Sequence, residues 1–185
     1  MSKKHKYRSD YEVHETQVPG RKQPKYKTEL KYVGKYYVLE TKESEFKTLK
    51  WMNMLSMSLI AGIFLGLGFL NNQGGRLIYV ILPYIIMFLP IYYGILGSIK
   101  LLSLKDRMTV IEYERSSIRV KKSSLSLTVL AITTAIGEGV YLLRIINRQG
   151  DNSLEYIFFA GIIIILIFSL FALRIQARIR VKEEK

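Results

Sequence analysis

The chain has 185 residues, with 28 Lys and Arg against 15 Asp and Glu, and it contains no cysteine. The absence of cysteine excludes disulfides, thiolate catalysis and zinc sites built on Cys. A net charge of +13 is typical of nucleic-acid-binding domains, but 49% of the residues are hydrophobic. The sequence has neither a Gly-rich phosphate loop nor an aromatic RNA-binding signature. We therefore expect no nucleic-acid partner.

The first 28 residues are polar, rich in Lys and interrupted by Pro19, Gly20 and Pro24. Such a composition does not build a hydrophobic core, and Pro and Gly break regular elements. We expect residues 1–28 to form a basic cytoplasmic tail that is disordered or becomes ordered on a partner. Its two histidines are isolated, so we expect no metal site, and nothing else in the chain indicates a cofactor.

Four apolar stretches follow, each long enough to cross the roughly 30 Å hydrocarbon core of a bilayer as a helix. They run over residues 52–70, 77–99, 125–143 and 154–173. The second stretch contains Pro83 and Pro90, which predict a kink. The sequence thus predicts an all-α integral membrane protein with four transmembrane helices.

Lys and Arg are concentrated between these stretches. Residues 1–50 hold 13 of them, residues 100–122 hold 7 and residues 174–185 hold 5, whereas the loops 71–76 and 144–152 hold the remaining three. By the positive-inside rule, we expect both termini and the middle segment to be cytoplasmic. The basic flanks would then contact the anionic inner leaflet of the cytoplasmic (plasma) membrane.

The chain also contains an internal repeat. Residues 35–50 align without gaps with residues 107–122, and each copy precedes two apolar stretches. Since both copies begin on the same side of the membrane, we expect two parallel repeats of a helix hairpin, related by an axis along the membrane normal. Their bounds are residues 29–100 and 101–185.

Two interpretations of the repeated motif remain open. Strand-favouring residues occupy alternate positions at Thr109, Ile111 and Tyr113 and again at Ile118 and Val120, and the first motif repeats this less cleanly, which favours a short cytoplasmic β-hairpin before each pair of spans. The two hairpins could pair into one small sheet. Alternatively, residues 44–50 form an amphipathic extension of the first transmembrane helix.

Small residues recur every four positions in the first and third spans. The two sets are Ser58, Gly62 and Gly66, and Ala131, Ala135 and Gly139. Such stripes allow helix backbones to approach closely in lipid. We therefore expect helix packing through these residues, with the first and third spans crossing stripe to stripe.

Glu138 is the carboxyl placed well inside a predicted span. A carboxyl in lipid is costly, and such residues usually face the bundle interior and have a function. Thr134 and Tyr141 lie about one helical turn away on either side and could form hydrogen bonds with it. Glu138 is therefore a candidate proton, ion or partner site. The alternative is a protonated structural group held by a helix neighbour or by Arg144.

No predicted region contains a nucleophile with its base, a carboxylate pair or a ligand cluster, so we expect no enzyme activity. The sequence favours a non-catalytic accessory or scaffold subunit of a multi-protein membrane complex, for example a transport complex. Its partners would be other membrane or cytoplasmic subunits, or a second copy as a homodimer. The alternative function is a small proton- or cation-coupled transporter that uses Glu138.

Overall fold

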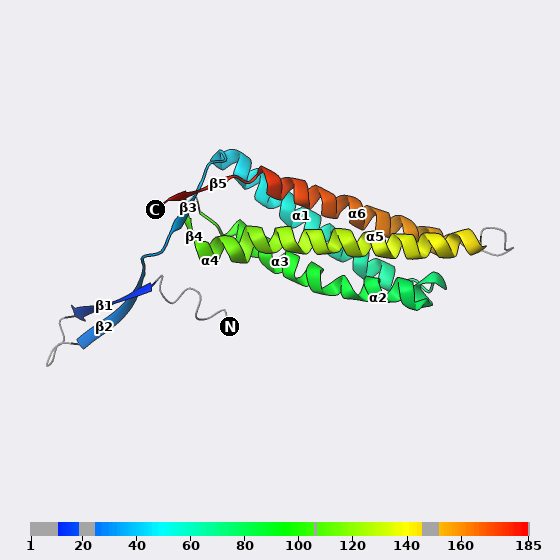
Figure 1. The fold of residues 1–185 in the computed structure, drawn as a ribbon, viewed down its shortest axis with the longest axis horizontal. Coiled ribbons are helices and arrows are strands. Elements are labelled where there is room, and N and C mark those ends of the chain that lie inside the picture. The colour runs from blue at the N-terminus through cyan, green and yellow to red at the C-terminus, as the bar shows by residue number, and fades with distance from the viewer. Residues whose placement is uncertain (1–10, 19–24, 106, 146–151, 185) are drawn as a thin grey trace.

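The computed structural model describes residues 11–18, 25–105, 107–145 and 152–184, and its main body is an antiparallel bundle of long helices (Figure 1). Four helical segments are long and apolar enough to cross a membrane: Glu43–Gly68, Ile78–Leu102, Val110–Ile145 and Ser153–Arg178. The core of each predicted apolar stretch lies within one of these segments. The prediction of four membrane-spanning helices is therefore confirmed at the level of helix length and composition.

The elements follow one another along the chain as strands, helices and two short helical turns. In order they are β1 (Tyr11–Val18), β2 (Lys25–Tyr32), β3 (Tyr36–Leu39), α1 (Glu43–Gly68), the 3-10 turn η2 (Gly74–Arg76), α2 (Ile78–Ile86), α3 (Phe88–Leu102), β4 (Arg107–Thr109), α4 (Val110–Tyr113), the π-helical turn η3 (Glu114–Ile118), α5 (Arg119–Ile145), α6 (Ser153–Arg178) and β5 (Val181–Glu184). The order strand, long helix, helix thus occurs twice.

The second transmembrane segment is broken between α2 and α3, as its prolines predict. Pro90 has no N–H group, so it cannot donate to the carbonyl of Ile86. At the break, the N–H of Met87 lies 3.2 Å from the carbonyl oxygen of Pro83 and 3.1 Å from that of Tyr84. The segment therefore bends at Met87 while its backbone donors remain satisfied.

A three-stranded sheet closes one end of the bundle, which we call the sheet end. β3 is the central strand and pairs antiparallel with both β4 and β5. Lys35 pairs with Glu183, and Arg107 lies 3.2 Å from Glu184. The hydrogen bond and the charge of Glu183 raise the pKa of Lys35, but exposed pairs of this kind contribute little stability. The sheet joins segments far apart in sequence.

The predicted hairpins are wrong, although strands of the two motifs do pair. After β4 the chain enters a helix, because Thr109 caps it: the Thr109 hydroxyl accepts from the N–H of Glu112, and the Glu112 carboxylate accepts from the N–H of Thr109 at 2.8 Å. This capping box satisfies two donors that a helix start leaves free. In the first motif α1 begins at Glu43, so the helical extension is the correct alternative there.

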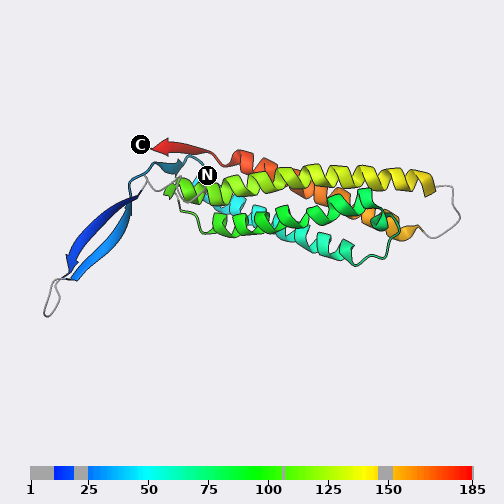
Figure 2. The same cartoon turned by 60° about the horizontal axis from the view of Figure 1, so that its bottom comes forward.

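The N-terminal segment contains two strands, which our prediction of a tail that is disordered or becomes ordered on a partner did not include. β1 and β2 form an antiparallel hairpin in which Tyr11 is opposite Tyr32, and it projects away from the bundle beyond the sheet end (Figure 1, Figure 2). Both strands contain Val, Thr, Leu or Tyr, which favour strands. Residues 1–10 and 19–24 lie outside the described residues.

The small-residue stripe of the first span points outward, which contradicts the predicted crossing. α1 packs against α3 and α6, whereas α5 packs against α6, α3 and α2, so α1 and α5 are diagonal neighbours. Ser58, Gly62 and Gly66 are all exposed. The face of α1 that turns inward instead carries Met57 and Ile60, both fully buried.

Close helix contacts are made by glycines that our prediction did not include. A Cβ on Gly94 of α3 would lie 2.8 Å from the sulfur of Met57, and a Cβ on Gly161 of α6 would lie 2.5 Å from Leu67. In α5, Ala131 is fully buried and Ala135 packs against the same core, while Gly139 faces Phe159 of α6 at 3.8 Å. The second stripe therefore packs on α6.

A chain of buried polar side chains connects all four transmembrane segments near the sheet end. Ser117 donates to the carbonyl oxygen of Gln176 at 2.7 Å, and the amide of Gln176 donates to Asn53 at 3.2 Å. Asn53 in turn donates to Ser98 at 2.8 Å, and Ser98 donates to the carbonyl of Gly94 at 2.8 Å. Each polar group thus has a partner inside the bundle.

Replacing Asn53 by Ala removes two of these hydrogen bonds and leaves the Gln176 amide without its acceptor. We expect a loss of about 1–2 kcal/mol in the free energy of unfolding, measured by thermal or denaturant unfolding in detergent. The control is Thr133→Ala, because the exposed hydroxyl of Thr133 bonds only within its own helix. Equal losses in the two variants would contradict a stabilising role for the network.

Candidate functional site: two buried carboxyls at the loop end

The opposite end of the bundle, which we call the loop end, contains two buried carboxyl groups. Glu138 lies on α5 with 0% of its surface exposed, and Glu155 lies in the first turn of α6 with 5% exposed. The connection between α1 and α2, residues 69–77, contacts both of them. The site is therefore built from two helices and one short loop.

Glu155 accepts three hydrogen bonds from the loop. The backbone N–H groups of Gln73 and Gly74 donate to its two oxygens at 2.6 and 3.1 Å, and the side-chain amide of Asn72 donates at 3.2 Å. Backbone donors that converge on a carboxylate fix a loop in place. Glu155 therefore holds the α1–α2 connection against the N-terminus of α6.

Glu138 has a different environment, although it lies beside Glu155. Both of its carboxyl oxygens are buried and, among the described residues, neither has a hydrogen-bond partner. Gly74 packs directly against this carboxyl, since a Cβ on Gly74 would lie 2.8 Å from Cδ of Glu138. Two ionised carboxylates have no donor between them. If Glu138 carries a proton, its O–H could donate a hydrogen bond to the carboxylate of Glu155.

The structure does not place the predicted partners on Glu138. The hydroxyl of Thr134 is buried and donates to the carbonyl of Leu130 in its own helix at 2.9 Å. The hydroxyl of Tyr141 donates to the side chain of Gln73 at 3.3 Å, which brings Tyr141 to the loop. Arg144 is exposed. Thus Tyr141 reaches the site through Gln73, and Thr134 does not reach it.

Glu155 is the residue that the sequence analysis missed. It lies at the edge of the fourth apolar stretch, where a charged residue is ordinary, and we expected no carboxylate pair. The pairing depends on the antiparallel packing of α5 and α6, which brings residues 17 positions apart to the same level. The Gly74–Gly75 dipeptide is the signal that could have indicated a close backbone approach.

The arrangement limits the chemistry that the site supports. Within the described ranges, no group of three or more His, Asp or Glu side chains could hold a metal ion. Two adjacent buried carboxyls can share one proton, because ionising both would place like charges together in a medium of low dielectric constant. The site can therefore bind and release a proton, or hold the loop in place.

No protein-family model, curated protein or solved structure is significantly similar to this chain.

Replacing Gly74 by Ala tests the contact with Glu138. The new methyl group would overlap the buried carboxyl, so we expect a loss of about 1–3 kcal/mol in the free energy of unfolding. In a Glu138→Ala background the same change should cost much less, and the double-mutant cycle in detergent measures this coupling.

The matched control for this cycle is Gly62→Ala. A Cβ on Gly62 meets nothing within 4 Å, so the methyl group should not lower stability, and the higher helix propensity of Ala should raise it by up to about 1 kcal/mol. If Gly74→Ala costs the same with and without Glu138, the carboxyl does not occupy the space next to Gly74.

Proposed function

We propose that this chain is a non-catalytic accessory or scaffold subunit of a multi-protein membrane complex. Its four helices span the cytoplasmic membrane with both termini in the cytoplasm. The observation that carries the proposal is the outward face of α1, where a stripe of small residues is exposed and has no partner in the described part of the chain.

The stripe offers room for another helix. Ser58, Gly62 and Gly66 follow one face of α1, and a Cβ on either glycine would meet nothing within 4 Å. Leu55 and Leu65 beside the stripe are 62% and 59% exposed. Small residues flanked by larger ones favour helix association in lipid, because they allow close backbone contact. A transmembrane helix of a partner subunit fits this face.

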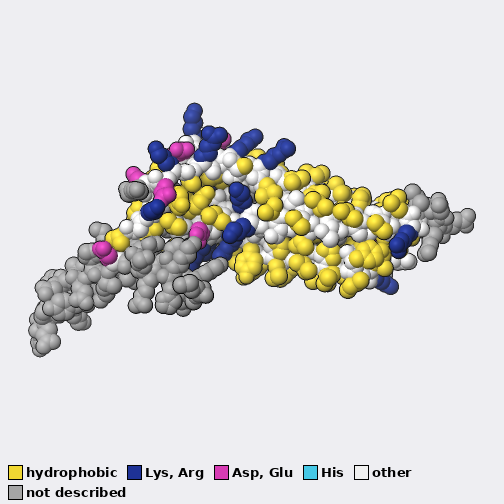
Figure 3. Space-filling view, in the orientation of Figure 1, with side chains coloured by type: hydrophobic (Ala, Val, Ile, Leu, Met, Phe, Trp, Pro, Cys, Tyr) yellow, Lys and Arg dark blue, Asp and Glu magenta, His cyan; other side chains and the backbone are white. Residues whose placement is uncertain are grey.

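The charge distribution on the surface supports the orientation. In the view of Figure 3, apolar side chains cover the helices and most Lys and Arg gather at the sheet end, with a few at the other end. Basic groups favour the cytoplasmic side of a bilayer. The sheet end, which carries β3, β4 and β5, is then available to cytoplasmic parts of the same complex.

The assembly is tested by Gly62→Leu with Gly66→Leu. The added side chains have free space within the chain, so we expect the variant to fold normally and to lose its companion subunits. Masses of the complexes extracted from the native membrane in mild detergent, with mass spectrometry of the companions, measure this loss. The expected outcome is that the wild-type chain has companions in a fixed ratio and the variant has almost none.

The matched control is Ala160→Leu, which adds a similar side chain at an exposed position of α6. This variant should keep its companions. The proposal fails if the wild-type chain runs alone at its own mass of 21.5 kDa plus detergent. It also fails if the control releases the companions as the stripe variant does.

One observation favours a second candidate, a small proton- or cation-coupled transporter. The carboxyl of Glu138 is buried and, in the described part of the chain, has no hydrogen-bond partner, while it lies beside a second acid. Intramembrane carboxyls in this condition are typical of proton relays. Deeper in the bundle, the side chains of Ser117, Gln176, Asn53 and Ser98 bond to one another, as do those of Thr128 and Ser169, which favours the subunit over the transporter.

Glu138→Gln tests the transporter. Gln keeps the shape of the side chain but cannot exchange a proton, so proton movement through the protein should stop. The measurement is acidification of liposomes that contain the protein, followed with a pH-sensitive dye under an imposed membrane potential. A circular dichroism spectrum and an unfolding midpoint that match the wild type show that the fold is intact. Unchanged proton movement rules out this role.

A further inference from the structure

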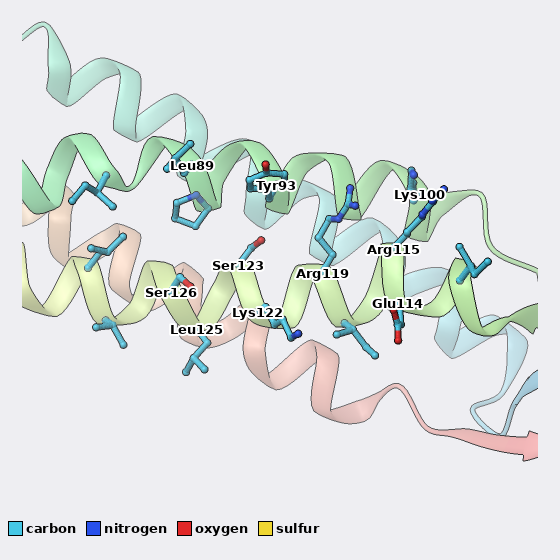
Figure 4. A pocket seen from close by; sticks show the side chains of 16 residues that line it. Leu89, Tyr93, Lys100, Glu114, Arg115, Arg119, Lys122, Ser123, Leu125 and Ser126 are labelled. Carbon is cyan, nitrogen blue, oxygen red and sulfur yellow. The ribbon is translucent and has the colours of Figure 1, made fainter. Parts of the chain in front are cut away.

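A groove of about 1300 Å³ runs along the outside of the bundle between the second and third transmembrane segments. Its walls come from α2 and α3 on one side and from α4, η3 and α5 on the other (Figure 4). The floor is closed, because α3 approaches the other wall at Gly97, where a Cβ would lie 2.8 Å from Val120 and 3.3 Å from the carbonyl of Ser116.

Cationic side chains gather in the part of the groove near the sheet end. Arg115 and Arg119 reach toward α3, where Lys100 stands beside them (Figure 4). Arg119 lies 5.9 Å from the ring centre of Tyr93. Two further lining residues, Lys122 and Glu114, point away from α3 in this view. The lining of the groove thus contains four cationic residues and one acidic residue, Glu114.

Three of the cations that line the groove have no counter-charge among the described residues. In the part of the chain that the structure describes, Lys100, Arg115 and Arg119 have no carboxylate within ion-pair distance. Like charges that line one groove repel one another, most strongly next to apolar surface where screening is weak. An anion between them would remove this repulsion and could accept a bidentate pair of hydrogen bonds from each guanidinium.

The remainder of the groove is mostly apolar, with Ser123 and Ser126 as its polar side chains. From the cations it continues toward the middle of the bundle over Ile86 and Leu89 on one wall and over Leu125 and Val129 on the other. Leu89, Leu125 and Val129 are each 56% exposed, so they offer open contact area along the groove. The site therefore combines an anion-binding end with a long apolar trough, which matches a headgroup and its acyl chains.

The depth of the cations in a bilayer fits this match. The helical segment Val110–Ile145 has 36 residues, about 54 Å at 1.5 Å per residue, which exceeds the roughly 30 Å hydrocarbon core. If the outer boundary is at Leu143, the last apolar residue before Arg144, the inner boundary falls near Ser123. Lys122 and Arg119 then lie about 2 and 6 Å beyond it, next to the phosphates.

From this geometry we propose that the groove between α3 and α5 binds one anionic phospholipid of the inner leaflet. Its phosphate lies among Lys100, Arg115 and Arg119, and one acyl chain follows Leu89 and Val129. The π-helical turn η3 contributes to the site, because it turns Ser116 and Ser117 inward while leaving Arg115 exposed. The proposal requires membrane insertion with the sheet end in the cytoplasm, but no partner subunit.

The experiment is native mass spectrometry of the full chain in detergent, with phosphatidylglycerol or phosphatidylcholine added at equal concentration. We expect one phosphatidylglycerol to remain bound at activation energies that remove phosphatidylcholine. The double variant Arg115→Gln with Arg119→Gln should bind phosphatidylglycerol about 30-fold more weakly, because it loses the attraction of two cations for anionic lipid. Lys100→Gln, on the opposite wall of the groove, should lower the affinity for phosphatidylglycerol less than the double variant does. The two effects should add when the substitutions are combined.

The control variant is Arg174→Gln with Arg178→Gln on α6. This pair has the same spacing and lies at the same end of the bundle, and both residues are exposed, but neither lines the groove. Circular dichroism and the unfolding midpoint of each variant verify the fold. If both double variants lose the same amount of phosphatidylglycerol binding, the proposed site is wrong and the lipid binds through general surface charge.

A competition experiment separates the lipid from a soluble anion that carries the same phosphate. Glycerol 3-phosphate at millimolar concentration should not displace phosphatidylglycerol, because it lacks the acyl chains that the trough contacts. If glycerol 3-phosphate displaces phosphatidylglycerol when the two are at equal concentration, the proposal is wrong, and the cations bind a soluble phosphate compound instead.

Discussion

Polar groups placed among apolar helices must find partners within the bundle, and this constraint determines how the four segments pack. Three layers of buried polar side chains satisfy it. They are the chain Ser117, Gln176, Asn53 and Ser98 near the sheet end, the pair Thr128 and Ser169 in the middle, and Glu155 with Asn72 at the loop end. Among the described residues, Ser124 and Glu138 are exceptions, since their buried side-chain oxygens have no hydrogen-bond partner. Because lipid offers no water as a substitute partner, these bonds favour one arrangement of helices over its alternatives.

The same constraint explains which face of α1 turns inward. Asn53 must reach both Ser98 on α3 and Gln176 on α6, so α1 lies between those two helices and opposite α5. A stripe of small residues cannot compete with this, since it gains only close contact and supplies no bond. The stripe of α1 is consequently left on the surface of the bundle, where we propose that it binds a partner helix.

The sequence analysis succeeded where a local pattern determines the outcome and failed where a contact does. Apolar length predicted the four helices, and Pro83 with Pro90 predicted the break near Met87. The capping box of Thr109 and Glu112 is also a local pattern, but we interpreted these residues as a strand because strand-favouring residues alternate there. Glu155 could not be recognised as a partner of Glu138, because only the packing of α5 on α6 makes them neighbours. Membrane orientation and the duplication stay predictions.

The two proposed surfaces are carried by different helices, which has a consequence for how the protein would work in a complex. The stripe belongs to α1, whereas the groove is lined by residues of the second and third transmembrane segments and by none of α1. A partner helix on α1 therefore leaves the cations around Arg119 open to lipid. Effects of variants at Gly66 and at Arg119 should then add, because distant sites without shared contacts are independent. An anionic lipid at the groove would fix the depth of the bundle in the bilayer, and so the level at which α1 presents its stripe.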